Sequence, residues 1–188
     1  TEILKDEPRT CANKLLSSVI QSSSIIDNVA TIRRIHAERP VLRVKNLDDV
    51  IRDEILHYPG AEISYRPTGF SVLADDLIPV VFRNLISNSL KFGEQKARVE
   101  ISAAPVGKDE VEVAVADTGP GIPSAALAKI FEPYFTTKPF GTGLGLTIVF
   151  KIVKEHFGDI SVTSREKEGT TFTITLPVPQ KEKMLIDY

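Results

Sequence analysis

The alternation of apolar and polar residues changes its period along the chain and divides the chain near residue 40. Over residues 9–36, apolar residues recur at spacings of three and four, which predicts one long amphipathic helix. Pro40 is expected to end this helix, because proline lacks a backbone donor and clashes with the preceding turn. The helix needs a partner for its apolar seam, which consists of Leu15, Val19, Ile26, Val29 and Ile32.

Beyond residue 40, helical and strand-like patterns follow one another. Helices are predicted over residues 47–57, 78–92 and 147–156, from their apolar periodicity and their start and stop signals. Strand-like segments predict three hairpins, which pair residues 62–66 with 70–73, 97–103 with 110–116, and 158–164 with 170–176. Helices interspersed with hairpins indicate an α+β fold, a two-layer sandwich in which helices cover one face of an antiparallel or mixed sheet.

Three polar residues share one edge of the helix predicted over residues 78–92. Asn84, Asn88 and Lys91 fall within roughly 60° of one another, beside an apolar stripe that can face a core. Carboxamide oxygens can complete the coordination of a magnesium ion that carries nucleotide phosphates, and a lysine ammonium can offset phosphate charge. Taken alone, an ordinary polar helix edge is the simpler explanation.

Two glycine-containing segments strengthen the case for a ligand site. A strand predicted over residues 111–116 leads into Asp117, and the glycines that follow let a flat ligand approach the backbone, although a plain tight turn is the alternative. Residues 141–146, with the sequence GTGLGL, precede a helix, and backbone amides at a helix start bind phosphate well. This segment is no dinucleotide fingerprint, because Leu146 occupies the position of the third glycine, and the chain contains no Walker motif.

The order of these motifs resembles that of the catalytic and ATP-binding domain of sensor histidine kinases. The wider superfamily, the GHKL or Bergerat group, also holds the type II topoisomerase ATPase, the MutL mismatch-repair ATPase and the heat-shock chaperone ATPase. Residues 84–92 are similar to the asparagine box, 117–123 to the first glycine box, 130–138 to the phenylalanine box, 141–146 to the second glycine box and 168–172 to the terminal Gly-Thr motif. The departures are Ser89 for a usual alanine, Phe92 for a usual tyrosine and residues 156–159 for a usual His-Gly-Gly, and none is a ligand position.

The resemblance implies a Bergerat-type fold that binds ATP with Mg²⁺, and it assigns roles to individual residues. Asn88 would be the principal magnesium ligand with Asn84 beside it, and Asn84, Lys91 and Lys138 are the catalytic candidates. Asp117 would accept a hydrogen bond from the adenine amino group. The full set of expected nucleotide-binding residues is Asn84, Asn88, Lys91, Asp117, Gly119, Gly121, Thr137, Lys138, Gly141, Thr142, Gly143, Leu144, Gly145, Leu146 and Thr170.

The implied function is the catalytic core of a two-component sensor histidine kinase, which transfers the γ-phosphate of Mg-ATP to a histidine for relay to a response regulator. One alternative is a GHKL-type ATPase, whose members carry a glutamate base in the place of Asn84. An amide cannot take a proton from water, so Asn84 favours the kinase. The other alternative is a non-catalytic nucleotide-binding module that only regulates, whose sign would be a broken ligand motif.

The acceptor histidine is expected to lie outside this chain. In the family it is followed by an acidic residue, whereas His36, His57 and His156 are followed by alanine, tyrosine and phenylalanine. Each of the three is expected to be a surface or capping residue. Residues 1–40 would then be the second helix of a dimerisation hairpin whose acceptor-bearing helix is missing, residues 41–179 the ATP-binding catalytic domain, and residues 180–188 a loose tail.

Composition agrees with this division of the chain. At 188 residues, it can bury one domain core plus an appendage. A net charge of −2 gives no electrostatic argument for nucleic acid as a partner. No apolar run is long enough to span a membrane, and the single cysteine, Cys11, fits a reducing compartment. We expect a homodimer through the N-terminal helix of the full-length protein, located in the cytoplasm or in the cytoplasmic part of a membrane-bound sensor.

Overall fold

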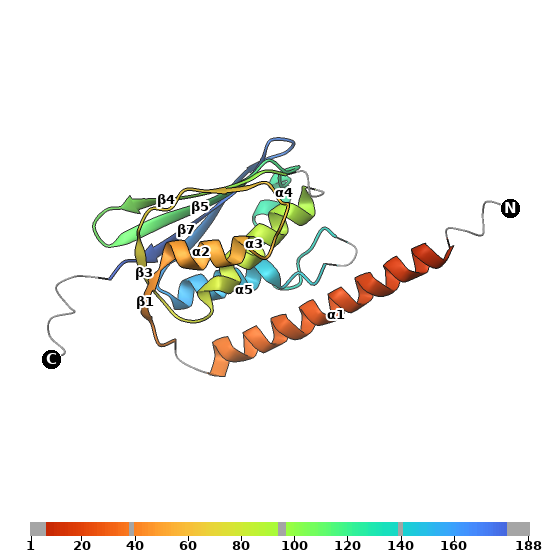
Figure 1. Ribbon diagram of the computed structural model, residues 1–188, viewed down its shortest axis with the longest axis horizontal. Coiled ribbons are helices and arrows are strands. Elements are labelled where there is room, and N and C mark those ends of the chain that lie inside the picture. The colour runs from red at the N-terminus through yellow and green to blue at the C-terminus, as the bar shows by residue number, and fades with distance from the viewer. Residues whose placement is uncertain (1–6, 38–39, 94–96, 139–140, 180–188) are drawn as a thin grey trace.

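Figure 1 shows the computed structural model, which describes residues 7–37, 40–93, 97–138 and 141–179. Along the chain, the elements are α1 Glu7–Ala37, β1 Arg43–Asn46, α2 Leu47–Ile55, β2 Ile63–Tyr65, β3 Ser71–Ala74, α3 Ile78–Phe92, β4 Val99–Val106, β5 Glu110–Asp117, α4 Ser124–Leu127, α5 Gly145–Glu155, β6 Asp159–Arg165 and β7 Gly169–Pro177. The tail expected over residues 180–188 lies outside the described residues.

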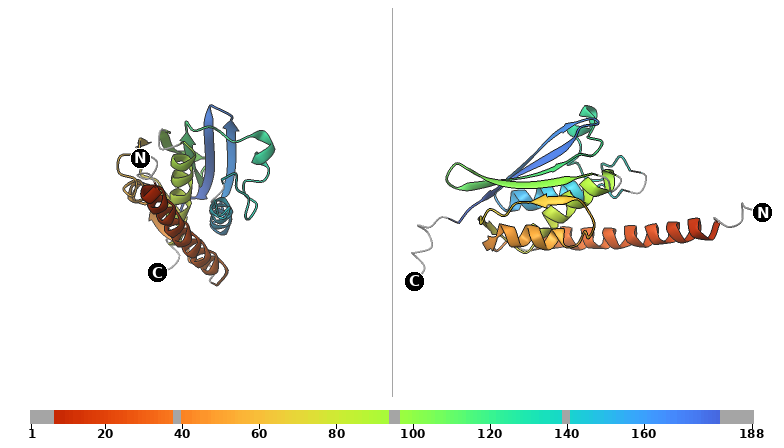
Figure 2. Two further views of the ribbon diagram at one scale, coloured as in Figure 1. Left: turned by 90° about the vertical axis from the view of Figure 1, so that its right-hand side faces the viewer. Right: turned by 45° about the horizontal axis from the view of Figure 1, so that its top comes forward.

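The main sheet has five strands in the order β2-β4-β5-β7-β6. β2 pairs in parallel with β4, and all the other pairs are antiparallel. Alternate side chains of β5 and β7 are buried, including Val113 and Ile174, because one face of the sheet packs against helices. Figure 2 shows the sheet as one layer and α2, α3 and α5 as the other. The predicted α+β two-layer sandwich is therefore confirmed.

The helices bury the apolar stripes that their sequences predict. Phe82 and Leu85 of α3 and Ile148 and Ile152 of α5 are completely buried, and each such side chain contributes about 1.5–3 kcal/mol through burial. The burial fixes the rotation of α3 about its axis. Its polar edge, with Asn84, is thereby held at the border of the core instead of inside it.

The first predicted hairpin is wrong in its pairing, although both of its strands exist. β2 pairs with β4 of the main sheet, whereas β3 pairs with β1, a strand that the sequence pattern did not predict. The Asp48 carboxylate anchors the connection between β2 and β3, because it accepts hydrogen bonds from the backbone N–H groups of Thr68 and Gly69. This anchor directs the chain from one sheet to the other instead of folding it back on itself.

The other two predicted hairpins are confirmed. β4 pairs with β5, and β6 pairs with β7, each in an antiparallel register. β4 continues to Val106, three residues beyond the predicted end, and the turn that follows uses Gly107 with a φ of 62°. The short helix α4 was not predicted. These antiparallel pairs bring the end of β5 and the start of β7 together at one end of the sheet.

Helix α1 forms as predicted, but its apolar seam does not face the rest of the domain. Leu15, Val19 and Ile26 are 64%, 65% and 68% exposed. Only the C-terminal part of α1 packs against α5, through Ile32 and Ile35, and the N-terminal part projects beyond the domain (Figure 1). Most of the seam therefore has no partner among the described residues of the chain.

Candidate functional site

A large cavity in the described part of the chain has a volume of about 530 Å³, which is in the usual range for a small-molecule site. Its walls come from α3, the end of β5, the loop that follows β5, the segment before α5, the start of β7 and, unexpectedly, α1. The structure brings together all of the predicted nucleotide-binding residues except Gly119 and Leu144, which are not among the residues that line the cavity. The binding roles of all these residues stay predictions.

One end of the cavity is organised around Asp117, the last residue of β5. Its Oδ2 accepts a hydrogen bond from Ser89 Oγ at 2.9 Å, and its Oδ1 accepts one from Gly119 N at 2.8 Å. These two donors fix the orientation of the carboxylate. Ser89, a departure from the family pattern at a position that binds no ligand in the family, therefore contacts a predicted ligand position directly.

Thr170 lies opposite Asp117 because the antiparallel register of β5 and β7 pairs these two residues. Ser164 Oγ donates to Gly169 O at 2.8 Å and accepts from Ile122 N at 2.8 Å. Its only hydrogen is thereby used, so Thr170 donates in the 2.9 Å contact between the two hydroxyls. The Thr170 oxygen is left as an acceptor beside Asp117, and Ser164, which does not itself line the cavity, orients the Thr170 hydroxyl.

Gly121 and Gly143 are required by close backbone packing. Both have positive φ, 73° and 65°. A Cβ atom at Gly121 would lie 2.1 Å from Arg165 O, and one at Gly143 would lie 2.3 Å from Tyr134 C. At Gly121 this differs from the expectation of a glycine that lets the base approach, because the space that a side chain would need is filled by the backbone of the β6–β7 turn.

Part of the cavity wall is apolar. It includes Ile122, Ile130, Phe135 and Phe172. Phe131, in contrast, packs against the core, with its ring centroid 6.4 Å from that of Phe172. A slot of this kind suits a flat aromatic ligand with polar groups at its edge.

The edge of α3 presents carboxamide oxygens at the other end of the cavity. Asn84 Nδ2 donates to Val80 O at 2.8 Å, which orients the carboxamide so that Oδ1 lies beside Gly145, 2.8 Å from where a Cβ atom would be. Asn88 lines the same cavity, and none of the described residues forms a hydrogen bond with its carboxamide. Two neutral oxygens fit a magnesium ion only as a minor part of its shell, with phosphates and water supplying the rest.

Lys91 and Lys138 both line the cavity, but Lys138 makes a contact that the sequence did not predict. Its Nζ donates to Lys91 O at 2.8 Å and lies 3.8 Å from the centroid of the Phe92 ring. Burial and the Lys91 charge lower the pKa of Lys138. Phe92, the second departure from the family pattern, therefore helps to position a predicted phosphate-binding lysine.

Helix α1 supplies two residues of the cavity wall, Ser24 and Asn28. Asn28 Nδ2 donates to Thr142 Oγ1 at 3.4 Å, across 114 positions of sequence. Neither residue was predicted from the sequence. The only available signal was their place on the side of α1 that also carries Ile32 and Ile35.

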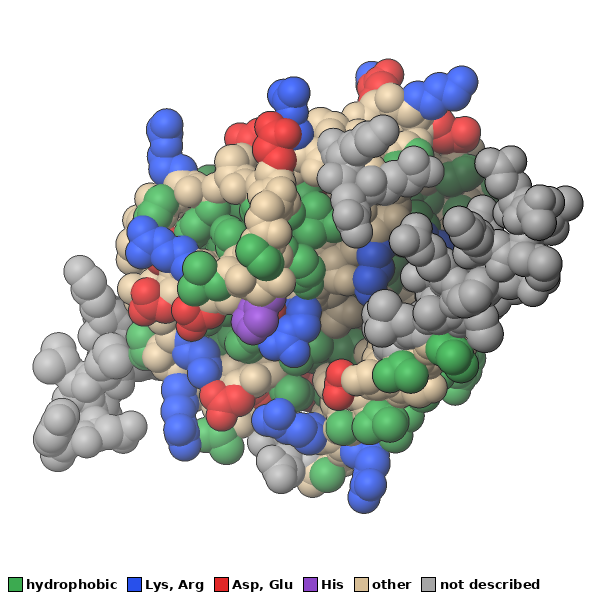
Figure 3. Space-filling view, turned by 45° about the vertical axis from the view of Figure 1, so that its right-hand side comes forward, with side chains coloured by type: hydrophobic (Ala, Val, Ile, Leu, Met, Phe, Trp, Pro, Cys, Tyr) green, Lys and Arg blue, Asp and Glu red, His purple; other side chains and the backbone are tan. Residues whose placement is uncertain are grey.

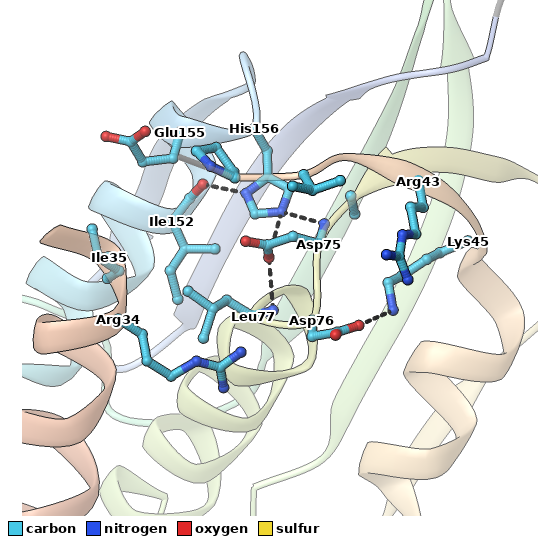
Figure 4. A pocket seen from close by; sticks show the side chains of 13 residues that line it. Arg34, Ile35, Arg43, Lys45, Asp75, Asp76, Leu77, Ile152, Glu155 and His156 are labelled. Carbon is cyan, nitrogen blue, oxygen red and sulfur yellow. Dashed lines mark hydrogen bonds and ion pairs between the residues drawn. The ribbon is translucent and has the colours of Figure 1, made fainter. Parts of the chain in front are cut away.

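A second cavity, of about 230 Å³, lies where the end of α1 meets β1, the start of α3 and the end of α5 (Figure 4). His156 is buried in its wall, so it is not a surface residue, but it is the C-cap residue of α5, which was the other alternative expected for it. Its Nδ1–H donates to Ile152 O at 2.6 Å, and its Nε2 accepts from Asp75 N at 2.9 Å. The Nδ1 contact holds the ring against its own helix, and the Nε2 contact fixes the turn before α3 to the end of α5.

Charged groups around this second cavity largely neutralise one another. Lys45 Nζ lies 2.7 Å from Asp76 Oδ1, and hydrogen bonding to Lys45 lowers the pKa of Asp76, with Arg43 and Arg34 adding to the effect. Acidic and basic side chains are also mixed over the described part of the face seen in Figure 3. Neither the second cavity nor the described part of that face gathers charges of one sign, as a binding site for a polyanion would require.

The family model described as histidine kinase-, DNA gyrase B-, and HSP90-like ATPase matches residues 75–180. The sensor histidine kinase ZraS of Escherichia coli (strain K12) is 44% identical over 55% of this chain and 22% of its own length. Sporulation kinase E of Bacillus subtilis (strain 168) is 37% identical over 57% of this chain and 16% of its own length. The chain thus spans less than a quarter of the length of these two relatives.

Solved structures of similar fold include the catalytic domain of the histidine kinase ThkA, with a TM-score of 0.64 and 32% identity over 73% of this chain and 95% of that one. Full-length ShkA in complex with AMPPNP gives a TM-score of 0.74 at 27% identity over 92% of this chain and 39% of that one. ThkA in complex with the response regulator protein TrrA gives 0.70 at 26% identity over 95% of this chain and 52% of that one.

Two further observations concern the helices of the chain and the ligand of the large cavity. None of the helices described here has the length and apolar character that crossing a membrane requires. A match to an ATPase family over more than half of the chain supports ATP as the ligand of the large cavity. The chain belongs to the histidine kinase-, DNA gyrase B- and HSP90-like ATPase family, and its curated relatives include sensor histidine kinases.

Proposed function

We propose that this chain is the catalytic core of a sensor histidine kinase, which binds Mg-ATP in the large cavity and transfers the γ-phosphate to a histidine outside the chain. One observation carries the proposal: a single cavity joins the Asp117 and Thr170 acceptors at one end to the Asn84 and Asn88 carboxamides at the other. The names of the relatives support the same activity.

The Asp117 end suits adenine. The exocyclic amino group of the base would donate to the carboxylate, whose orientation Ser89 and Gly119 fix. Thr170 would accept from the same edge of the base through a water molecule. The apolar wall would cover the two faces of the ring.

The Asn84 end suits phosphates and their metal ion. Asn88 would be a direct magnesium ligand, and Asn84 would bind in the second shell or through water. Magnesium would neutralise phosphate charge when bound, while Lys91 would contact a phosphate directly. Lys138 would also contact a phosphate, after its hydrogen bond to Lys91 O is broken. Backbone amides at the start of α5, in residues 141–146, add donors at the positive end of the helix dipole.

Transfer by such a site depends on positioning and charge stabilisation, with the nucleophile supplied by the acceptor histidine. A hydrolytic ATPase would need a base near the attacking water. Among the described residues that line the cavity, Asp117 is the only carboxylate, and it lies at the adenine end with both oxygens already accepting hydrogen bonds. Asn84 cannot serve, because an amide takes no proton. These features favour the kinase over the ATPase.

ATP turnover by this chain alone tests the choice between kinase and ATPase. We expect the chain to bind Mg-ATP and to release inorganic phosphate at close to the rate of ATP in buffer, because no base activates water. Phosphate release should be measured at saturating Mg-ATP, with the Asn88→Ala variant as the blank for contaminating hydrolases. Sustained turnover that Asn88→Ala abolishes would favour the ATPase.

Asp117 should make the site select ATP over GTP. Its carboxylate would pair with the amino donor of adenine but would face the carbonyl acceptor of guanine, and such a mismatch typically costs about 1–3 kcal/mol. Competition against a fluorescent ATP analogue should therefore require at least about fivefold more GTP than ATP. Displacement by GTP at the same concentrations as ATP would contradict the role of Asp117.

We further propose that the exposed seam of α1 forms a homodimer interface in the full-length protein. Apolar residues in this number at one face of a helix indicate a docking surface, and in the family a hairpin partner would cover them. A response-regulator receiver domain is the expected second partner, in line with the complex of ThkA with TrrA. A cytoplasmic location stays a prediction.

Replacing Val19 and Ile26 together by glutamate should weaken self-association of this chain. Both side chains are about two-thirds exposed, so the variant should fold normally while charges interrupt the seam. Sedimentation over a range of concentrations should show a shift from dimer to monomer, with Ser23→Glu, an exposed position of α1 outside the seam, as the control. A wild-type chain that is monomeric throughout would contradict this role of the seam.

A further inference from the structure

The face of α1 that points toward the domain changes from apolar to polar where it passes the large cavity. At about 100° per residue, one side of the helix carries Ser24, Asn28, Ile32 and Ile35. Ile32 and Ile35 pack against the core, whereas Ser24 and Asn28 line the cavity. A helix that only had to pack against the domain would continue its apolar face. The two polar residues therefore need a different explanation.

The hydrogen bonding of Asn28 is only partly used. Its single contact with the described residues is the one from Nδ2 to Thr142 Oγ1, and 3.4 Å is longer than an ordinary N–H···O bond. The same Oγ1 also accepts from Leu144 N at 3.4 Å. The Asn28 carboxamide oxygen has no partner among these residues. So weak a contact does not account for a half-buried carboxamide at this place.

Asn28 lies near the end of the cavity that we assign to phosphates. Its contact, Thr142, belongs to the glycine-rich segment at the start of α5. Gly145, three residues further on, lies against Asn84 Oδ1. The Asp117 carboxylate, at the other end, is held by Ser89 instead. A side-chain amide near the phosphate end can donate to a phosphate oxygen, and a donor to a charged group forms a strong hydrogen bond.

We propose that Asn28 is a further ATP-binding residue, which donates its carboxamide N–H to the terminal phosphate of ATP and makes helix α1 part of the nucleotide site. The inference rests on the proposed function, because it takes the nucleotide phosphates to lie at the Asn84 end. ADP lacks the γ-phosphate, so in the ADP complex Asn28 keeps its hydrogen bond to Thr142. Asn28 therefore determines the preference for ATP over ADP, and the γ-phosphate links α1 to the ATP-binding domain.

The test is calorimetric titration of the whole chain with ADP and with a non-hydrolysable ATP analogue, both with magnesium. Asn28→Ala should lower the affinity for the analogue about tenfold or more and leave that for ADP within about twofold, as expected for loss of a hydrogen bond to a charged group. Asn28→Asp should lower the affinity for the ATP analogue further, because it places a negative charge beside the phosphate. Ser23→Ala, on the opposite and exposed side of α1, should change neither affinity.

The outcomes separate the two proposals. Binding of neither nucleotide to the wild-type chain would contradict the proposed function and the role of Asn28 with it. Binding of both nucleotides, with an unchanged ratio of affinities in Asn28→Ala, would overturn the role of Asn28 alone. An equal loss for both nucleotides would also overturn it, because a purely structural effect of α1 on the cavity would not depend on the γ-phosphate.

Discussion

Replacing Asn88 by alanine is expected to abolish the magnesium-dependent part of ATP binding while the fold stays intact. The side chain lines the cavity and forms no hydrogen bond with the described residues, so folding does not depend on it. In the proposed site it is the one direct protein ligand of the metal ion, whose other positions go to phosphate oxygens and water. Calorimetry with and without magnesium measures the effect.

Wild-type protein in a chelator is the matched reference for this variant. Asn88→Ala in magnesium should bind ATP as weakly as wild type without magnesium, and adding magnesium to the variant should change little. Its melting temperature should stay within a few degrees of wild type, because the residue fills no core space. A normally melting variant with unchanged Mg-ATP affinity would remove Asn88 from the metal site.

Helical periodicity and fixed motif spacings predicted most of the candidate site. The polar edge of α3 follows from the 3.6-residue period, because burying Phe82 and Leu85 leaves Asn84 and Asn88 at the rim of the core. This feature depends on a local rule that a single sequence displays. The position of Thr170 opposite Asp117 does not, because it needs β5 and β7 to be neighbours, which the sequence pattern did not predict. Thr170 was expected at the site only through the resemblance to the family.

The residues that were missed reach the site through tertiary structure. Ser164 joins the loop after β5 to the start of β7, and Asn28 approaches from a helix more than a hundred positions away from its contact. Neither belongs to a periodic pattern around the ligand. Ser89 was visible as an unusual residue, but its hydrogen bond to Asp117 depends on how α3 packs against β5.

The one wrong strand pairing has a similar cause. Strand-like residues on both sides of a Pro-Thr-Gly turn favour a hairpin locally. The buried Asp48 carboxylate, which lies about twenty positions earlier in the chain, instead captures the backbone of Thr68 and Gly69 and separates the two strands. The residues of the turn do not show that a distant side chain binds their backbone, so this contact could not be predicted from the sequence of the turn.

The second large effect concerns phosphate transfer, which this chain should not carry out on itself. None of its three histidines lines the large cavity. His36 Nδ1–H donates to Ile32 O at the end of α1, and His57 lies 3.8 Å from Glu54 on α2. His156 is buried with both ring nitrogens engaged. Catalysis by positioning then has no nucleophile within the chain to position.

Labelling with γ-³²P-ATP and magnesium tests the central claim most directly, on this chain alone and on the same chain supplied with a helix that carries a histidine followed by an acidic residue. We expect no label on the chain alone and acid-labile label on the added histidine, lost with Asn88→Ala. Acid-labile label on the isolated chain, removed by changing His36, His57 or His156, would contradict the account. So would an unlabelled added histidine in a sample that binds Mg-ATP.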